Sequence, residues 1–370
     1  MCGKVRHQRL QPYRRGMTTQ GWALEVARDD LAAAEVVEVA VPEPADGEAL
    51  LRVDRVGLTA NNVTYAVLGE AFRYWEFFPA GQGRGRVPLW GFAEVVASRA
   101  EGVEIGRRLY GYLPTASHLL VRPGRVDARG FRDTSEHRAA LPSPYNAYAL
   151  TTGDAAYEVG REDLQVLYRP LFFTSWMLAD QLAETPGPRV LAISSASSKT
   201  AYGTAFALQD SGVEVVGLTS PGNVAFTSDL GVYDRVLAYD AVGELAQVPT
   251  AYVDVAGSTP VREAVHAHLG QDLVLDLIVG VTHQDGSRAG QLAGARPTTF
   301  FAPDRITQRT ADWGRDGFDA RFGEAWRAFA PVVEGWVDVT VRQGPQALRE
   351  VWLEVLSGAS APRTGHVLQL

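Results

Sequence analysis

The sequence contains a single cysteine, Cys2, so the chain cannot form an internal disulfide, and a metal site built on thiolates is not expected. It also has no run of the roughly 18 consecutive apolar residues that a membrane-spanning helix needs. Lysine and arginine number 35 against 43 aspartates and glutamates. The resulting net charge of −8 argues against a nucleic-acid partner, because phosphate binding depends on basic residues. We therefore expect a cytoplasmic protein without disulfides, membrane spans or nucleic-acid partners.

The first 16 residues, MCGKVRHQRLQPYRRG, lack the apolar core of a secretory signal and show no apolar periodicity. Their positive charge also fits a mitochondrial address. We predict a basic tail over residues 1–16, either native or produced by a translation start placed before Met17.

The remaining chain has the composition of a globular enzyme, with 46% apolar and 21% charged residues. Its first part carries short β-rich runs separated by glycine, at residues 41–62, 88–114 and 117–123. That spacing predicts a compact, barrel-like β domain. Residues 131–169 are predicted to be a connection, and the apolar spacing of residues 170–184 predicts a helix.

From residue 189 onward the pattern changes to apolar runs that alternate with helical ones. Runs that are apolar almost throughout are typical of strands in a parallel sheet that is buried on both faces. Six such strands interleaved with helices predict an α/β fold with a doubly wound parallel sheet. The predicted strands are residues 189–196, 213–220, 235–240, 251–257, 273–280 and 298–303.

The predicted sheet is followed by a loop and helix up to residue 336, and the chain ends in a strand, a helix, a glycine turn and a strand. This last β segment can rejoin the first domain. We thus predict a substrate domain formed by residues 17–165 and 331–370, and a nucleotide-binding domain formed by residues 166–330.

The first turn between a strand and a helix of this sheet, SSASSKTA, is the predicted phosphate site. In such sheets a pyrophosphate rests on the N-terminus of the first helix, after a turn of small residues. Ala196, Ser198 and Ala201 keep that small-residue spacing although the usual glycines are missing. The residues predicted to bind the cofactor in this turn are Ser195, Ala196, Ser197, Ser198, Lys199 and Thr200.

The turn has two other interpretations. An ATP-binding P-loop requires glycine at two positions that are Ile193 and Ser198 here. Alternatively, the turn is kept small only for packing between helix and strand.

The end of the second predicted strand bears on the choice between NADP(H) and NAD(H). NAD enzymes place a carboxylate there to bind the ribose 2′-hydroxyl, whereas residues 217–223 contain none. Thr219, Ser220 and Asn223 can instead hydrogen-bond a 2′-phosphate, and Lys199 or Arg235 can supply positive charge. The predicted cofactor is NADP(H).

Several stretches of the sequence resemble a known superfamily. RVGLTANNVTYAVLG, GVEIGRRLYGYLP, LFFTSWMLADQL and APRTGHVLQL resemble segments of the zinc-free, quinone-oxidoreductase-like branch of the medium-chain dehydrogenase/reductases. TANNVTY, SSASSKTA, GLTS and DWG resemble the uncharacterised DUF2855 family more closely. The ligands of the zinc-dependent alcohol dehydrogenases have no counterpart in this sequence.

The resemblance implies a Rossmann domain and a β-rich, GroES-like domain that the C-terminus rejoins. It places Thr174 beside the nicotinamide and implies a homodimer formed through edge strands of the Rossmann sheet. Further cofactor contacts are expected at Tyr233, Gly257, Gly280 and Thr282.

The segment TANNVTYAVLGEAFRYWEFFP supplies the predicted substrate site. Zinc-free hydride transfer to a conjugated alkene requires groups that polarise the carbonyl and a tyrosine or water that delivers a proton. The candidate catalytic residues are Asn61, Asn62, Tyr65 and Tyr74, the two tyrosines as candidate proton donors, with neighbouring aromatic rings as the wall of an apolar pocket. Alternatively, these aromatic residues belong only to the core.

These observations predict an NADP(H)-dependent, zinc-free reductase of a small apolar carbonyl compound: an enone, a quinone or an enoyl thioester. Two alternatives stay open. One is a carbonyl reductase on the same scaffold, and the other is a protein that binds a nucleotide or ligand without turnover. The segment DWGRDGFDARFGEAW is predicted either to be structural or to line the substrate site.

Overall fold

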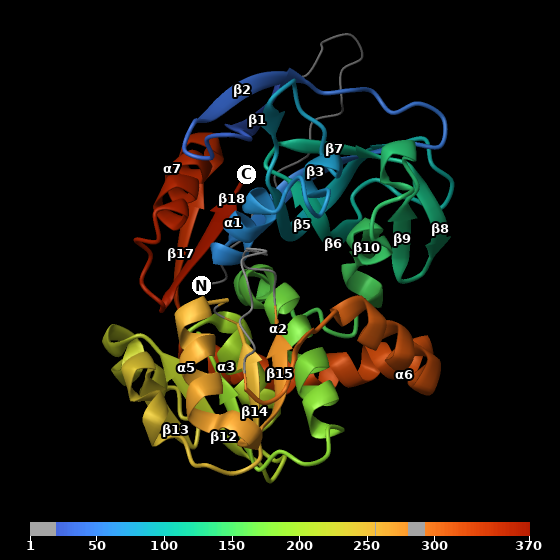
Figure 1. Ribbon diagram of the computed structural model, residues 1–370. Coiled ribbons are helices and arrows are strands. Elements are labelled where there is room, and N and C mark those ends of the chain that lie inside the picture. The colour runs from blue at the N-terminus through green and yellow to red at the C-terminus, as the bar shows by residue number, and fades with distance from the viewer. Residues whose placement is uncertain (1–19, 256, 280–292) are drawn as a thin grey trace, which may run out of the picture.

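The computed structural model describes residues 20–255, 257–279 and 293–370. Two lobes lie one above the other, with mainly antiparallel sheets in the first and a parallel sheet in the second (Figure 1). Helix α2 (Glu162–Ala183) lies between them. Among the described residues, no helix combines the length and the apolar character needed to cross a bilayer.

The second lobe contains a parallel sheet of six strands in the described part of the chain. Their order across the sheet is β13 (Arg235–Ala238), β12 (Glu214–Thr219), β11 (Val190–Ile193), β14 (Thr250–Asp254), β15 (Leu273–Ile278) and β16 (Pro297–Thr299). Numbered along the chain, this is the 3-2-1-4-5-6 order of the Rossmann fold. The predicted doubly wound sheet is confirmed, and its crossover lies between β11 and β14.

The helices of this lobe connect and cover the strands. They are α3 (Lys199–Ala207), α4 (Val224–Asp229), α5 (Thr259–Leu269) and α6 (Ala302–Val333), with the 3₁₀ turns η5 (Pro221–Asn223), η6 (Tyr239–Glu244) and η7 (Gly270–Asp272). Because β11 is buried at all four positions, both of its faces need such a cover.

The first lobe combines two sheets. The smaller has the order β2 (Ala34–Ala40), β1 (Gln20–Ala27) and β4 (Arg84–Gly85). The larger has the order β17 (Asp338–Gln343), β18 (Thr364–Gln369), β3 (Ala49–Leu58), β5 (Pro88–Ser98), β6 (Arg108–Pro114), β10 (Ala147–Leu150), β9 (Gly130–Asp133) and β8 (Pro123–Asp127), and β7 (His118–Val121) pairs with β3. Since β18 pairs with β3, the predicted return of the C-terminus to the first domain is confirmed.

Short helical elements complete this lobe. They are α1 (Ala60–Val67), α7 (Gly344–Leu356), η1 (Tyr74–Glu76), η2 (Glu136–Arg138), η3 (Ser143–Asn146) and η4 (Thr151–Gly153). Helix α1 follows β3 directly, so the segment predicted to form the substrate site begins at the end of a central strand of the larger sheet.

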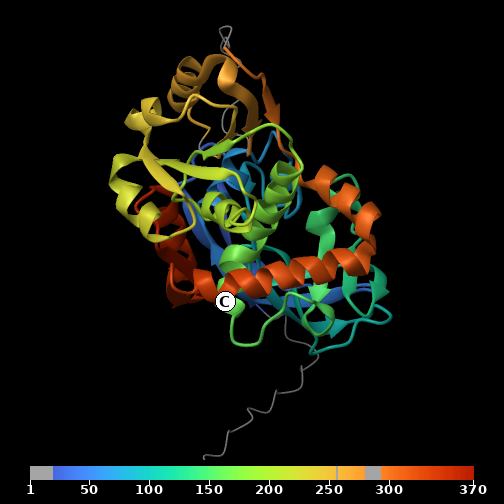
Figure 2. The same ribbon diagram turned by 90° about the horizontal axis from the view of Figure 1, so that it is seen from below.

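Two predicted boundaries are wrong. Helix α2 begins at Glu162, not at residue 170, and Pro170 lies inside it. The loop predicted after residue 303 is helical, because α6 spans Ala302–Val333 and is interrupted only at Gly314, whose φ of +70° bends the chain (Figure 2).

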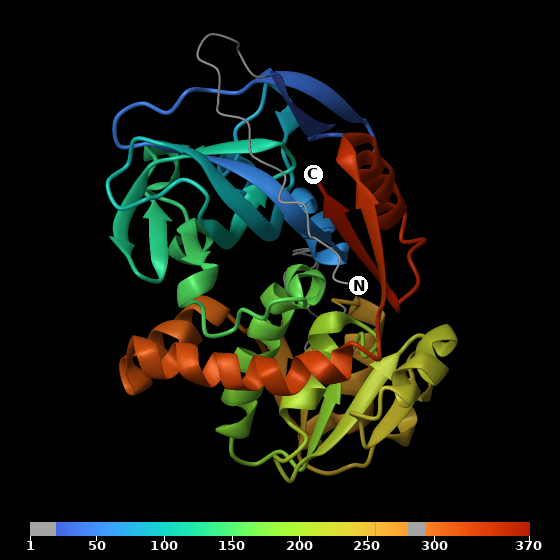
Figure 3. The same cartoon turned by 180° about the vertical axis from the view of Figure 1, so that it is seen from behind.

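Helix α6 contains the DWG segment and contacts both lobes. Seen from behind, it runs along the junction between them (Figure 3). Asp316 pairs with Arg129 beside β9 at 2.7 Å. Trp313 packs against Trp176 of α2, with ring centroids 6.0 Å apart, and lies between the guanidinium groups of two arginines of α6. This geometry supports the structural interpretation of the segment.

Candidate active site

The predicted phosphate turn connects β11 to α3 at the crossover of the sheet. Ser195 has a φ of +52°, a left-handed conformation that a glycine adopts without strain, so the serine stands where the turn chemistry favours glycine. Ser198 is the N-cap of α3, and its Oγ accepts a hydrogen bond from the Ala201 N–H at 3.4 Å. The N–H groups of the first turn of α3 are thus presented at a helix N-terminus, which favours anions.

Ala196 lies on the buried side of this turn, against Gly217 of β12. It is fully buried, and the Tyr233 hydroxyl donates to its carbonyl at 2.9 Å. A Cβ built on Gly217 would lie 2.9 Å from the Ala196 Cβ, so β12 and the turn approach closely only because both residues are small. Tyr233, a predicted cofactor contact, thus stabilises the turn through its hydrogen bond to Ala196.

Three predicted residues meet where β11 and β12 end. The Ser197 Oγ accepts hydrogen bonds from the Thr219 hydroxyl at 3.4 Å and from the Asn223 amide at 3.2 Å. Ser220 lies between the last two and is the N-cap of η5. The residues brought together here are neutral and polar, so no carboxylate among them opposes an added phosphate.

A residue that sequence reasoning missed, Asp254, joins the turns after β11 and β14. Its Oδ1 accepts from the Ser194 hydroxyl at 2.9 Å and from the Gly257 N–H at 2.8 Å, and its Oδ2 pairs with Arg262 at 2.5 Å. The N–H of Gly257, a predicted cofactor contact, is therefore engaged within the protein. The signal that could have found Asp254 is a carboxylate at the end of the apolar run AYVDVAG. Gly280 and Thr282 lie outside the described residues.

Lys199 has partners other than the predicted phosphate. Its Nζ donates to the Thr364 carbonyl of β18 at 3.3 Å and lies 5.6 Å from the centroid of the Tyr168 ring of α2. No carboxylate pairs with it in the described part of the chain, and burial lowers its pKa from 10.5 to about 8. The side chain thus lies at the contact between α3, α2 and the returning strand.

Substituting Lys199→Met is expected to raise the free energy of unfolding at pH 7 by on the order of 2 kcal/mol. The folded state binds this proton more weakly than the unfolded chain, so stability rises with pH between about 8 and 10.5 in the native protein. The gain of the variant should therefore shrink across that window. Urea unfolding at several pH values measures it, with Arg235→Met as an exposed control; a gain independent of pH would contradict the assignment.

The other side of the site is formed by α1 and β5 of the first lobe. The Tyr65 hydroxyl accepts a hydrogen bond from the Trp90 Nε1 at 3.2 Å. Burial raises the pKa of Tyr65 above its ordinary value, and Tyr74 adds to the rise, whereas the Trp90 and Asn61 side chains oppose it. In the described part of the chain, the Tyr65 hydroxyl makes no hydrogen bond as a donor, and it accepts one from Trp90. Tyr65 is left with a free O–H.

The remaining two predicted catalytic residues differ in their surroundings. The Asn62 amide caps α1 by accepting from the Thr59 N–H at 2.8 Å and donates to the Pro88 carbonyl at 2.9 Å, so it serves the fold. Tyr74 is half-buried with its ring 4.7 Å from that of Tyr65, and its hydroxyl interacts with Tyr145, while burial raises its pKa.

The sequence model of a family described as "Protein of unknown function (DUF2855)" matches residues 56–361. The chain belongs to the DUF2855 family. No curated protein sequence matches it. The quoted stretches that resemble this family had predicted the membership, which is confirmed.

Solved structures with this fold are similar to the DUF2855 chain over nearly its whole length. CurA from Vibrio vulnificus in complex with NADPH is 14% identical with a TM-score of 0.61, covering 93% of this chain and 96% of that one. A putative NADPH:quinone reductase from Mesorhizobium loti is 13% identical with a TM-score of 0.62, covering 96% and 100%. The quinone oxidoreductase from Coxiella burnetii is 15% identical with a TM-score of 0.55, covering 95% and 100%. At these identities the likeness establishes the two-domain fold.

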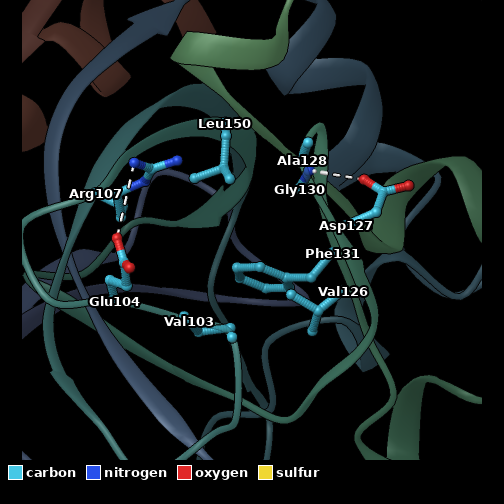
Figure 4. Close-up of a pocket in the computed structure, with 10 residues that line it drawn as sticks. Val103, Glu104, Arg107, Val126, Asp127, Ala128, Gly130, Phe131 and Leu150 are labelled. Atoms are coloured by element: carbon cyan, nitrogen blue, oxygen red, sulfur yellow. Dashed lines mark hydrogen bonds and ion pairs between the residues drawn. The ribbon is translucent and has the colours of Figure 1, made fainter.

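Two hollows of the DUF2855 chain differ in their relation to this site. One of about 230 Å³ lies at the outer end of the first lobe, between the β8–β9 hairpin and the segments beside β6 and β10, with Phe131 and Leu150 among its lining residues (Figure 4). None of the predicted site residues lines it. The other, of about 10 Å³ and thus large enough for about one water, lies where α2 meets α1, β3 and β5. It is lined by Gly57, Thr59, Asn61, Asn62, Trp90, Val166, Leu167 and Pro170.

Helix α2 leads from the smaller hollow toward the Rossmann sheet. Residues 166, 170 and 174 are spaced four apart and share one face of the helix. The Thr174 hydroxyl donates to the Pro170 carbonyl at 3.2 Å, and Ser175 donates to the Thr200 carbonyl at 2.7 Å. The hollow and the phosphate turn are therefore connected through one face of a single helix and its contact with α3.

Proposed function

We propose that this protein is an NADP(H)-dependent, zinc-free oxidoreductase that reduces an alkene conjugated to a carbonyl group. The observation that carries the proposal is the Tyr65 hydroxyl, which accepts from Trp90 and donates to no described residue, next to a hollow that Trp90 and Asn61 line between the substrate lobe and α2. The polar turn at the crossover of the Rossmann sheet lies further along α2, where Ser175 donates a hydrogen bond to the Thr200 carbonyl of α3. CurA, described in complex with NADPH, and the NADPH:quinone reductase share the fold and support the choice of cofactor.

The residues at the crossover fit a dinucleotide phosphate. The N-terminus of α3 offers N–H groups to the pyrophosphate, and Ala196 keeps the turn close to β12. Ser197, Thr219 and Asn223 form a neutral polar group that can hydrogen-bond the 2′-phosphate. When bound, NADPH supplies the hydride for the β-carbon.

Tyr65 acts by hydrogen bonding rather than by ionising. Because burial raises its pKa, the hydroxyl keeps its proton in the working pH range. Its O–H donates to the carbonyl oxygen of the substrate and stabilises the negative charge that develops there. A water molecule then delivers the proton to the α-carbon, which is the water alternative of the predicted proton donor.

Calorimetric titration of ligand-free protein with NADPH and with NADH tests the cofactor assignment. We expect NADPH to bind at least tenfold more tightly, since no carboxylate lies among Ser197, Thr219 and Asn223 to oppose its 2′-phosphate. Consumption of NADPH with a panel of enones tests turnover, and product analysis separates alkene from carbonyl reduction. Absence of binding by either nucleotide would reject the proposal.

A further inference from the structure

A proline inside α2 alters the hydrogen bonding of the residue four positions earlier. Pro170 has no N–H, so the Val166 carbonyl does not receive the helical hydrogen bond that a carbonyl inside a helix normally receives. Among the described residues, no backbone N–H from outside the helix donates to it. Val166 is only 2% exposed. A buried carbonyl in this situation is expected to have a partner, because buried main-chain groups without one are rare.

A glycine of β3 admits this carbonyl. A Cβ built on Gly57 would lie 2.3 Å from the Val166 oxygen, so any other residue at this position would force α2 away from the strand. Gly57, Val166 and Pro170 all line the smaller hollow. A proline in a helix interior and a glycine in a central strand thus place a carbonyl that lacks its helical donor against β3, in a residue that lines the hollow.

We propose that the main-chain carbonyl of Val166 is a hydrogen-bond acceptor of the active site and selects a bound molecule that presents an N–H or O–H donor to it. The inference rests on the proposed function, because it takes the hollow beside Asn61 and Trp90 to be part of the active site. Two groups have this chemistry. One is a hydroxyl next to the reacting carbonyl of the substrate, and the other is the carboxamide NH₂ of the nicotinamide.

The substitution Pro170→Ala tests the proposal because it restores an N–H that takes the Val166 carbonyl into the helix. It should raise Tm, since the helix regains a hydrogen bond, and it should weaken the binding of a donor-bearing ligand. A merely structural role for Pro170 would not couple higher stability to weaker binding. The matched control is Pro331→Ala, which makes the same change inside α6 at an exposed position.

Two pairs of probes distinguish the two sources of the donor. The first pair is 1-hydroxy-4-phenylbut-3-en-2-one and 4-phenylbut-3-en-2-one, which differ by the hydroxyl beside the carbonyl. The second is NADP⁺ and its 3-acetylpyridine analogue, which lacks the carboxamide NH₂. For at least one pair, we expect the donor-bearing member to bind about tenfold more tightly to the native protein by calorimetry. That ratio should fall to about one in Pro170→Ala and persist in Pro331→Ala.

The outcomes separate this inference from the proposed function. Ratios near one for both pairs in the native protein, or a ratio that survives Pro170→Ala, would overturn the role of the Val166 carbonyl. A ratio that collapses in Pro170→Ala supports it even when steady-state assays detect no reduction of any enone, and in that case the proposed reaction fails alone.

Discussion

Replacing Asp254 with alanine is expected to lower the free energy of unfolding by about 3 kcal/mol or more. The side chain is 1% exposed and makes three contacts at once, with the Ser194 hydroxyl, the Gly257 N–H and the Arg262 guanidinium. Alanine removes the acceptor of both groups, and hydrogen bonds to a charged group contribute more to stability than neutral ones do. Arg262 still has Asp276 as an ion-pair partner at 3.4 Å. The expected loss of stability is therefore at the lower end of the range for broken buried ion pairs.

Urea unfolding at pH 7 measures this loss, and two variants calibrate it. Asp254→Asn retains one oxygen for Ser194 and Gly257 but loses the charge opposite Arg262, so an intermediate loss is expected. Asp338→Ala removes the carboxylate of an exposed pair with Arg363 and should cost less than about 1 kcal/mol. Equal losses for Asp254→Ala and Asp338→Ala would show that Asp254 does not hold the two turns together.

The parallel sheet was predictable because its strands are short apolar runs, and burial on both faces leaves little else that such runs can be. The ends of helices α2 and α6 were not predictable in this way. A proline is typical of the first turn of a helix, which favoured a start at residue 170, whereas α2 continues through Pro170. In α6, only Gly314 departs from helical geometry, so the residues that the sequence pattern predicted to be a loop are helical on both sides of it.

The sequence predicted which types of residue form the candidate site better than it predicted what each of them does there. Small polar residues predicted the turn after β11, and Ser197, Thr219 and Asn223 do meet there. Lys199 and Asn62 could not be placed in advance, because their partners, Thr364 and Pro88, come from distant parts of the chain. The same holds for the Tyr65 hydroxyl, whose donor Trp90 lies on a strand that only the folded sheet brings near.

On the proposed function, Tyr65→Phe is expected to lower kcat by about 10²–10³-fold, the cost of removing one donor to a developing oxyanion. The fold should change little, because phenylalanine keeps the ring contacts with Tyr74 and Tyr112. The Trp90 N–H loses its acceptor, which costs about 1 kcal/mol of stability. Steady-state kinetics with NADPH and a reducible enone measures kcat and KM, and the loss should appear mainly in kcat since the hydrogen bond strengthens in the transition state.

The neighbouring Tyr112 provides the matched control. Its hydroxyl is buried without a hydrogen-bond partner in the described part of the chain, so Tyr112→Phe removes an oxygen of the same kind from the same aromatic cluster. We expect kcat to stay within about twofold and stability to rise slightly, because an unpartnered buried hydroxyl is a cost. On the proposed function, the native protein should also show no loss of kcat from Tyr65 ionisation up to pH 10, since burial raises its pKa. Similar kcat values for the Tyr65 and Tyr112 variants would remove Tyr65 from the reaction.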